Sequence, residues 1–340
     1  MGLVDIDTLR WRILMAGRGW DELGRKSDTS GGMLARHETW SREYFHDPYL
    51  IGANDERLAE RFRDVFINQT ELTDEAQIGM LRPGKSDFMR KFKHVMEEYS
   101  LRGGVPGEVV ENARAPLHRY FENGGPIANR IFNGFNRPND PFYVKYGRRE
   151  FLEPMLREGR VRICPASYYG DASHNEAVRD DEISRIFYVS TYLERLQGIS
   201  HVQVQGHRIP IGDDDIVLPI RFPDYFLMSL CDDIYYRMPT DFDADAALII
   251  TDPHRFTQRV ISTFLARFPD WRPLHGPVTY FDPYRDYSAF TVPEMGKPFS
   301  YSYQREVRIV FKPTRPVTAK LQPEMFEIGP IGDLAVLLSV

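Results

Sequence analysis

The fold prediction rests on the stretch Ser300-Tyr-Ser-Tyr-Gln-Arg-Glu-Val-Arg-Ile-Val-Phe-Lys312. Successive side chains of a β-strand point to opposite faces of its sheet. As a strand, this stretch would have one mostly apolar and aromatic face, made of Tyr301, Tyr303, Arg305, Val307, Ile309 and Phe311. The other face would carry Ser302, Gln304, Glu306 and Arg308. The alternation predicts a long strand, and one solvated face of an antiparallel sheet explains it by itself.

The rest of the chain divides into two parts with different patterns of apolar residues. The first third has helical spacing, with one apolar face expected on a helix over 86–102 and another over 58–66. The turn-forming residues 133–141 end this part. Strand candidates then follow in an irregular order with short helices, at 142–146, 161–164, 187–192, 201–204, 216–220, 225–230, 246–250, 278–280, 300–312 and 334–340. We therefore predict an α+β protein with a mostly helical domain at 1–138 and a sheet domain at 139–340.

Composition excludes several classes of protein. The chain has 340 residues and a net charge of −6, which argues against a bulk nucleic-acid coat protein or a basic membrane-surface protein. Its two cysteines cannot form a disulfide scaffold or a cysteine-type zinc site, and its nine histidines show no metal-binding spacing, so we expect no metal. No secretory signal or long apolar run is visible, and we expect a cytoplasmic protein that does not enter a membrane.

Two local motifs have competing interpretations. Gly79-Met-Leu-Arg-Pro-Gly84-Lys85-Ser86 fits the P-loop pattern of NTPases, and 248–252 could follow it as a second nucleotide motif. A P-loop needs a buried strand before it, and residues 71–78 are acidic and do not favour a strand, so a loop with a helix cap at Ser86 is the alternative. Arg90, Lys91 and Lys93 form a basic run that indicates either a solvated helix face or a nucleic-acid-binding patch.

Four segments together resemble a bacterial family of domains of unknown function. They are Tyr143-Val-Lys-Tyr-Gly147, Arg160-Val-Arg-Ile-Cys-Pro-Ala-Ser-Tyr-Tyr169, Ser229-Leu-Cys231 and Gln304-Arg-Glu306-Val-Arg308. The resemblance covers about 142–315. It departs from the family at Tyr169-Gly-Asp-Ala172, where the family has Phe-Asn-Asp-Pro, and at Cys231, where it has serine; Ser190 and Thr191 compete with Ser229 for the serine position.

The resemblance implies an ADP-ribosyltransferase-like fold with a split β-sheet, and NAD as the substrate. It assigns to Glu306 the stabilisation of positive charge on the ribose in the transition state. Gln304 would serve the acceptor, and a Gln-x-Glu pair suggests a nucleobase or amide acceptor in preference to arginine. Further candidates for contacts to NAD or to Glu306 are Lys145, Tyr146, Ser229, Tyr169 and Tyr235, each with ordinary packing as the alternative. Arg162 and Arg308 would meet phosphates or pair with acids.

The sequence therefore predicts an ADP-ribosyltransferase that acts as a toxin or phage-defence effector on RNA, DNA or protein. A restraining antitoxin or inhibitory protein would be its partner. An NAD glycohydrolase on the same fold is the first alternative. A non-catalytic binding module and a P-loop NTPase are the others.

Overall fold

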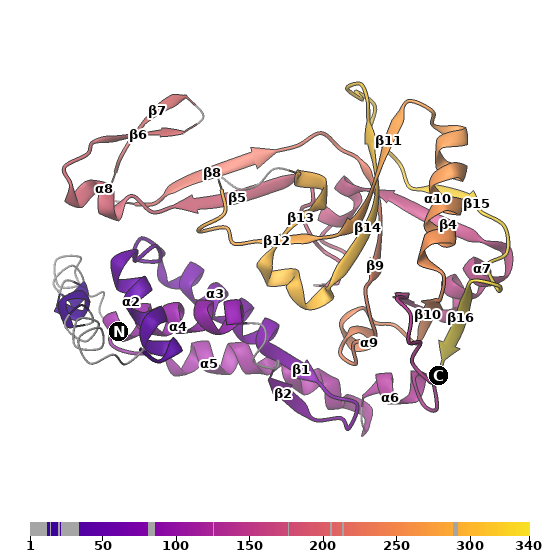
Figure 1. Ribbon diagram of the computed structural model, residues 1–340, viewed down its shortest axis with the longest axis horizontal. Coiled ribbons are helices and arrows are strands. Elements are labelled where there is room, and N and C mark those ends of the chain that lie inside the picture. Colours follow the sequence, from indigo (N-terminus) through magenta and orange to yellow (C-terminus); the bar gives the residue numbers. More distant parts are fainter. Residues whose placement is uncertain are drawn as a thin grey trace.

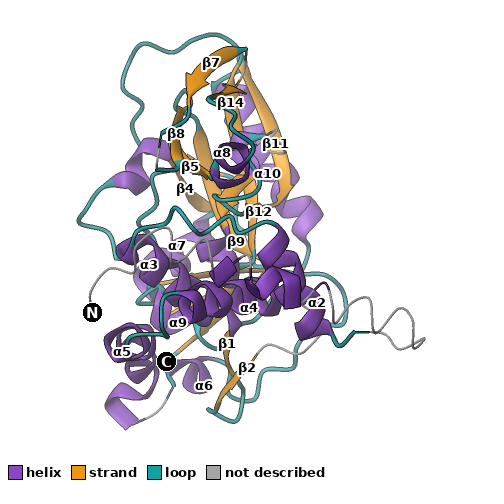
Figure 2. Cartoon of the chain, turned by 90° about the vertical axis from the view of Figure 1, so that its left-hand side faces the viewer, coloured by secondary structure: helices purple, strands orange, loops and turns teal. Residues whose placement is uncertain are grey.

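The chain folds into a helical part and a large antiparallel sheet (Figure 1). This computed structural model describes residues 12–13, 15–19, 21, 34–80, 86–124, 126–175, 177–204, 206–212, 214–287 and 292–340. Seen from the side, strands β9, β11 and β14 lie above the helices of the N-terminal part (Figure 2). The mixed α and β content predicted from the sequence is confirmed.

The helical part is built on two amphipathic helices that pack together. Its elements are α2 (Arg36–His46), α3 (Asp55–Gln69), α4 (Ser86–Leu101), α5 (Gly107–Arg114), the 3-10 helix η1 (Ala115–Gly124) and α6 (Ile127–Ile131). Asn54 caps α3 by accepting a hydrogen bond of 2.9 Å from the backbone N–H of Arg57. Leu58 and Phe62 of α3 share one core with Val95 and Tyr99 of α4, as the apolar spacing predicts.

The large sheet has the strand order β11-β14-β9-β3-β10-β16, with β4 paired to β9 and β15 paired to β4. All of these pairings are antiparallel. The strands are β3 (Tyr143–Gly147), β4 (Arg160–Pro165), β9 (Phe226–Cys231), β10 (Ala246–Ile250), β11 (Trp271–Pro277), β14 (Glu306–Pro313), β15 (Glu324–Glu327) and β16 (Ala335–Ser339). Among the described residues, Val144 and Cys231 form the one residue pair between β3 and β9. The pairing of these two strands is therefore short.

Both faces of the sheet are covered. Helices α7 (Arg149–Glu158) and α10 (Pro253–Arg267) pack on one face, where the rings of Phe264 and Phe311 stack with centroids 3.7 Å apart. On the other face, α6 and α9 (Met238–Asp241) pack on β3, β9 and β10. Strand β10 is therefore buried along its whole length, as expected for Ala-Ala-Leu-Ile-Ile.

Smaller ribbons extend from the sheet. The hairpin of β5 (Ser184–Val189) and β8 (Ile216–Arg221) runs above α2 and α3 in Figure 1 and ends in α8 (Tyr192–Leu196), β6 (His201–Val204) and β7 (His207–Pro210). Strands β12 (Thr279–Phe281) and β13 (Gly296–Pro298) form a parallel pair. Three short 3-10 helices, η2 (Ala166–Gly170), η3 (Pro293–Met295) and η4 (Phe299–Gln304), complete the described part of the chain.

The predicted long strand over 300–312 is wrong in its first half. Strand β14 begins at Glu306, residues 299–304 form η4, and Arg305 between them has a left-handed backbone with φ 44°. The cause is a tertiary contact. Asn68 of α3 donates to the carbonyl of Ser300 and accepts from the backbone N–H of Tyr303, both at 2.7 Å, which occupies backbone groups that a strand would need.

Other elements also differ from the prediction. Helix α10 and strand β11 were not predicted, although Asp252 caps α10 directly before Pro253, which is an ordinary helix-start signal. The expected strand over 187–192 ends at Val189 and gives way to α8. Residues 71–78, which the sequence does not favour as a strand, include parts of β1 (Thr70–Leu72) and β2 (Ile78–Met80), which form an antiparallel hairpin.

The hairpin bears on the P-loop interpretation. The strand that ends at Met80 belongs to a two-stranded antiparallel ribbon, whereas a P-loop follows a buried strand of a larger sheet. Residues 81–85, which include Lys85, lie outside the described residues.

The helical part and the sheet part are joined by buried polar contacts. Arg61 of α3 donates two hydrogen bonds, of 2.9 and 2.8 Å, to the carboxylate of Asp282. Helix α6 lies before the predicted boundary at 138 and packs in the core of the sheet with Val144 and Tyr146.

Candidate functional site

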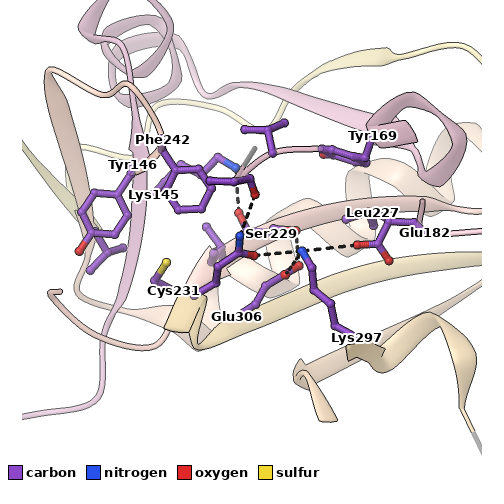
Figure 3. Close-up of a pocket in the computed structure, with 15 residues that line it drawn as sticks. Lys145, Tyr146, Tyr169, Glu182, Leu227, Ser229, Cys231, Phe242, Lys297 and Glu306 are labelled. Atoms are coloured by element: carbon purple, nitrogen blue, oxygen red, sulfur yellow. Dashed lines mark hydrogen bonds and ion pairs between the residues drawn. The ribbon is translucent and has the colours of Figure 1, made fainter. Parts of the chain in front are cut away.

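A cavity of about 200 Å³ lies beside Val144 and Cys231, where β3 pairs with β9. Its walls come from β3, β9, the start of β14, and the segments around residues 177–182, 242 and 297 (Figure 3). Six of the residues singled out from the sequence line it: Lys145, Tyr146, Tyr169, Ser229, Gln304 and Glu306. These residues are brought together because neighbouring strands carry their motifs, with Glu306 paired to Cys231 and Arg308 paired to Ser229.

Glu306 is a buried carboxylate in the cavity wall, and both of its oxygens accept hydrogen bonds. It is 5 % exposed. Its Oε1 accepts hydrogen bonds from Ser229 Oγ at 2.5 Å and from Arg308 Nε at 2.6 Å. Its Oε2 has longer contacts, 3.2 Å to Lys297 Nζ and 3.4 Å to Arg308 Nη2. A ligand hydroxyl that reaches Glu306 would therefore compete at Oε2, where the existing bonds are weaker.

The charge of Glu306 is fixed by its neighbours. Burial alone raises the pKa of Glu306, but Arg308 and Lys297 outweigh burial and lower this pKa to about 2. Burial lowers the pKa of Lys297, yet the carboxylates around it raise that pKa overall. At neutral pH the cavity therefore contains an ionised Glu306 between two cations.

A second group of buried charges, which includes Glu182 in the same cavity wall, lies beside Glu306. Glu182 accepts from Arg308 Nη1 at 2.9 Å and from Arg185 Nη2 at 2.7 Å. Burial raises the pKa of Glu182, but Arg308, Lys297 and Arg185 lower it overall. Asp180 is different, because burial and the charge of Glu182 raise its pKa to about 7. Asp180 Oδ2 has no hydrogen-bond donor among the described residues, and Lys297 Nζ lies 3.5 Å away.

Lys297 connects all three carboxylates and was missed by the sequence analysis. Its ammonium lies 3.0 Å from Gln304 Oε1, 3.2 Å from Glu306 Oε2 and 3.7 Å from Glu182 Oε1 (Figure 3). It comes from β13, in the segment Gly-Lys-Pro, which contains no recognisable motif. A buried lysine with several acceptors holds them in place at the cost of its own desolvation. Lys297 therefore positions the side chains of both Gln304 and Glu306.

Gln304 lies in the cavity wall but not where the strand prediction put it. It ends η4, so it does not share a strand face with Glu306. Its Nε2 donates to the carbonyl of Ala177 at 2.7 Å, and its Oε1 accepts from Lys297. With 3 % of its surface exposed, Gln304 has both ends of its amide engaged by the protein.

Lys145 is a cation at the cavity without a carboxylate partner among the described residues. Its ammonium donates to the backbone carbonyl of Ser229 at 2.8 Å. Burial lowers the pKa of Lys145, and the neighbouring Cys231, Cys164 and Glu306 only partly oppose this effect. Since Ser229 Oγ bonds Glu306, Ser229 connects Lys145 to the carboxylate through its own backbone.

Three aromatic side chains give the cavity apolar walls. Tyr146 and Phe242 stack nearly parallel, with centroids 6.3 Å apart and an angle of 13° between the planes. The hydroxyl of Tyr146 accepts from the backbone N–H of Tyr235 at 2.9 Å, which fixes the ring. Tyr169 approaches from another segment of the wall (Figure 3). Flat walls of this kind accommodate a planar ring.

Several residues singled out from the sequence lie elsewhere. Arg162 is exposed on β4, and its guanidinium lies 4.8 Å from the ring centre of Tyr168, which does not line the cavity. Tyr235 donates to Asp232 and faces another pocket. Arg308 is fully buried and pairs with acids, one of its two predicted roles. Ser190 and Thr191 follow β5 and do not line the cavity, so Ser229 is the serine beside Glu306.

The basic run on α4 is neutralised within the protein. Arg90 pairs with Asp87 at 2.7 Å, and Lys93 pairs with Glu97 at 2.5 Å. Lys91 also pairs with Asp87 and is nearly buried. Partly exposed ion pairs of this kind contribute little free energy. Nucleic-acid binding by this run therefore stays a prediction.

Comparison with known proteins gives no relative. No protein-family model, no curated protein and no solved structure matches the chain. Within the described part of the chain, no helix combines the length and the apolar character needed to cross a lipid bilayer.

Proposed function

We propose that the protein is an NAD-cleaving ADP-ribosyltransferase of the toxin or defence type, with an ADP-ribosyltransferase-like fold. The observation that carries this proposal is Glu306, an ionised carboxylate held by Ser229, Lys297 and Arg308 in the wall of a cavity with aromatic sides. The splayed junction of β3 and β9 supports the split sheet that such a fold requires.

The reaction breaks the bond between the nicotinamide nitrogen and C1′ of the ribose. The electron pair of that bond leaves with nicotinamide, and positive charge develops on the ribose ring, as in glycoside cleavage. A fixed negative charge beside the ribose stabilises this transition state more than the ground state, in which the positive charge lies on the nicotinamide ring. The nucleophile of the acceptor then bonds to C1′ and releases its proton to the solvent.

The cavity supplies the other parts of this chemistry. Tyr146, Phe242 and Tyr169 would flank the nicotinamide ring. A ribose hydroxyl would bond Oε2 of Glu306 in place of one of its two long contacts. Ser229 and Arg308 keep Oε1 fixed, so Glu306 would not have to reorganise during the reaction.

An NAD glycohydrolase is the second candidate, and the geometry of Gln304 favours it. Gln304 is buried and its amide is engaged by Ala177 and Lys297, so it offers little to a macromolecular acceptor. Water needs no such recognition. Gln304 would then be a positioning residue in both reactions.

One incubation separates the candidates. The purified chain is mixed with NAD labelled in the adenine half, together with separate RNA, DNA and protein fractions. Transfer predicts label on one macromolecular fraction, while hydrolysis predicts free labelled ADP-ribose and nicotinamide in the absence of any acceptor. If NAD stays intact with every fraction, the enzymatic proposal fails and a binding module becomes the better interpretation.

A further inference from the structure

A second cavity, of about 230 Å³, adjoins the Glu306 cavity. It lies between α3, η1 and η4, so the helical part supplies much of its wall. Ala177 lines both cavities. Gln304, in the wall of the first cavity, donates to the carbonyl of Ala177. The residue before Gln304 in the sequence, Tyr303, lies in the wall of the second cavity. The partition between the two cavities is therefore thin.

Guanidinium groups dominate the polar lining of this second cavity. Two acids, Glu60 and Asp64, line it. Four arginines also line it: Arg63, Arg119, Arg179 and Arg237. Arg237 is fully used, since it donates to Asp241 at 2.7 Å and to the carbonyl of Ile67 at 2.9 Å.

Two of these arginines keep unused donors. Arg119 pairs with Asp241 through Nη2, but its Nε is buried and has no hydrogen-bond partner in the described part of the chain. Arg179 is exposed, and its guanidinium has no described ion pair or hydrogen bond. A buried donor without an acceptor costs free energy unless a ligand or water satisfies it. Guanidinium donors match phosphate oxygens well.

The same cavity has an aromatic wall. Tyr301 and Tyr303 come from η4, and Tyr120 comes from η1. The hydroxyl of Tyr120 is bound to Asp241, which fixes its ring. Aromatic rings beside arginines are the usual surroundings of a nucleotide, whose base stacks while its phosphates pair.

We infer that the second cavity binds the diphosphate and adenosine of a dinucleotide, with Arg119 and Arg179 on the phosphates. The identity of the ligand as NAD rests on the proposed function. Ligand sites usually measure about 300–1,000 Å³. Each cavity alone is smaller than this, at about 200 and about 230 Å³, and only the two together reach that range. The helical part thereby completes the NAD site, and an extended ligand reaches both cavities past Ala177.

The test measures binding of ADP, which lacks the nicotinamide half, to the full chain by calorimetry. Arg179→Ala removes an exposed side chain, so the fold should tolerate it. We expect it to weaken ADP binding by about 10-fold, as the loss of one charge-assisted contact does. Adenosine, which carries no phosphate, should bind wild type and Arg179→Ala equally. The matched control is Arg272→Ala on β11, an exposed arginine remote from both cavities, which should bind ADP like wild type.

The outcomes distinguish this inference from the proposed function. ADP binding that falls with Arg179→Ala supports the phosphate site even if NAD is never cleaved, in which case only the proposed function fails. If Arg179→Ala cleaves NAD with the KM of wild type, or binds ADP with the affinity of wild type, the inference is wrong, and the proposed function is unaffected. Equal weakening by Arg272→Ala would also overturn it, because general charge would then explain the effect.

Discussion

Replacing Glu306 by glutamine removes the charge of the carboxylate and keeps its size. If Glu306 stabilises the ribose cation, the loss of one preorganised electrostatic contact costs about 2.7–4 kcal/mol in the transition state. NAD cleavage should then fall by roughly 10² to 10³-fold. The ground-state binding of NAD should change much less, since the charge on the ribose develops only during the reaction.

The same change also affects folding, because Glu306 is buried with Arg308. Removing one partner of a buried ion pair typically costs about 3–5 kcal/mol. Glu182 still pairs with Arg308 and lies near Lys297, so the two cations keep a partner. We expect a cost at the lower end of this range, about 3 kcal/mol, and for a chain of this length a decrease of roughly 4 °C in the melting temperature. Activity must therefore be measured well below the transition.

A matched control separates lost charge from lost stability. Glu98 is fully buried in the helical part and pairs with Arg102 at 2.6 Å, away from the cavity. Glu98→Gln should be destabilised to a similar degree and still cleave NAD at nearly the wild-type rate. The assay is release of nicotinamide by folded protein at 25 °C. If Glu306→Gln cleaves NAD normally, or if both variants lose activity in parallel with their stability, the assigned role of Glu306 is refuted.

Three further predictions follow from the contacts of the site. Lys297→Met removes a cation that lowers the pKa of Glu306, so NAD cleavage should decline on acidification at a pH about one unit or more higher than in wild type; superimposed pH profiles would contradict this. The pKa of Asp180 is about 7 in the fold and about 3.9 when unfolded, so the folded protein binds the extra proton and the free energy of unfolding should fall as pH rises from about 4 to 7. In chemical denaturation across this pH range, the free energy of unfolding of Asp180→Asn should fall less than that of wild type. An equal fall in the two proteins would contradict the raised pKa. Asn68→Ala removes the contacts that hold Ser300 and Tyr303, so it should cost about 1–3 kcal/mol in chemical denaturation and reduce NAD cleavage, whereas a stable and fully active variant would show that η4 does not need α3.

The sequence predicted well what depends on local pattern. The helical spacing of residues 86–102 and the apolar run at 246–250 correspond to α4 and β10. The segments that resemble a known family lie on neighbouring strands, so Lys145, Ser229 and Glu306 meet at one cavity.

What the sequence did not predict depends on contacts between distant segments. Alternation favoured a strand through 300–305, but Asn68, more than 200 residues earlier, holds these residues in η4. Lys297 lies in a segment with no motif, and its importance comes only from the three acceptors that the fold brings around it. The ion pairs of the basic run on α4 are an exception, because Asp87 and Glu97 lie three and four residues from Arg90 and Lys93 on the same helix, a spacing that the sequence already shows.

The most direct test of the central claim is a crystal structure of the full chain with a carbocyclic analogue of NAD that cannot be cleaved. The account predicts the nicotinamide ring against Tyr146 and Tyr169, and a ribose hydroxyl within hydrogen-bond distance of Oε2 of Glu306. An analogue bound elsewhere, or a cavity whose carboxylate contacts only Ser229, Lys297 and Arg308 at saturating concentration, would contradict it.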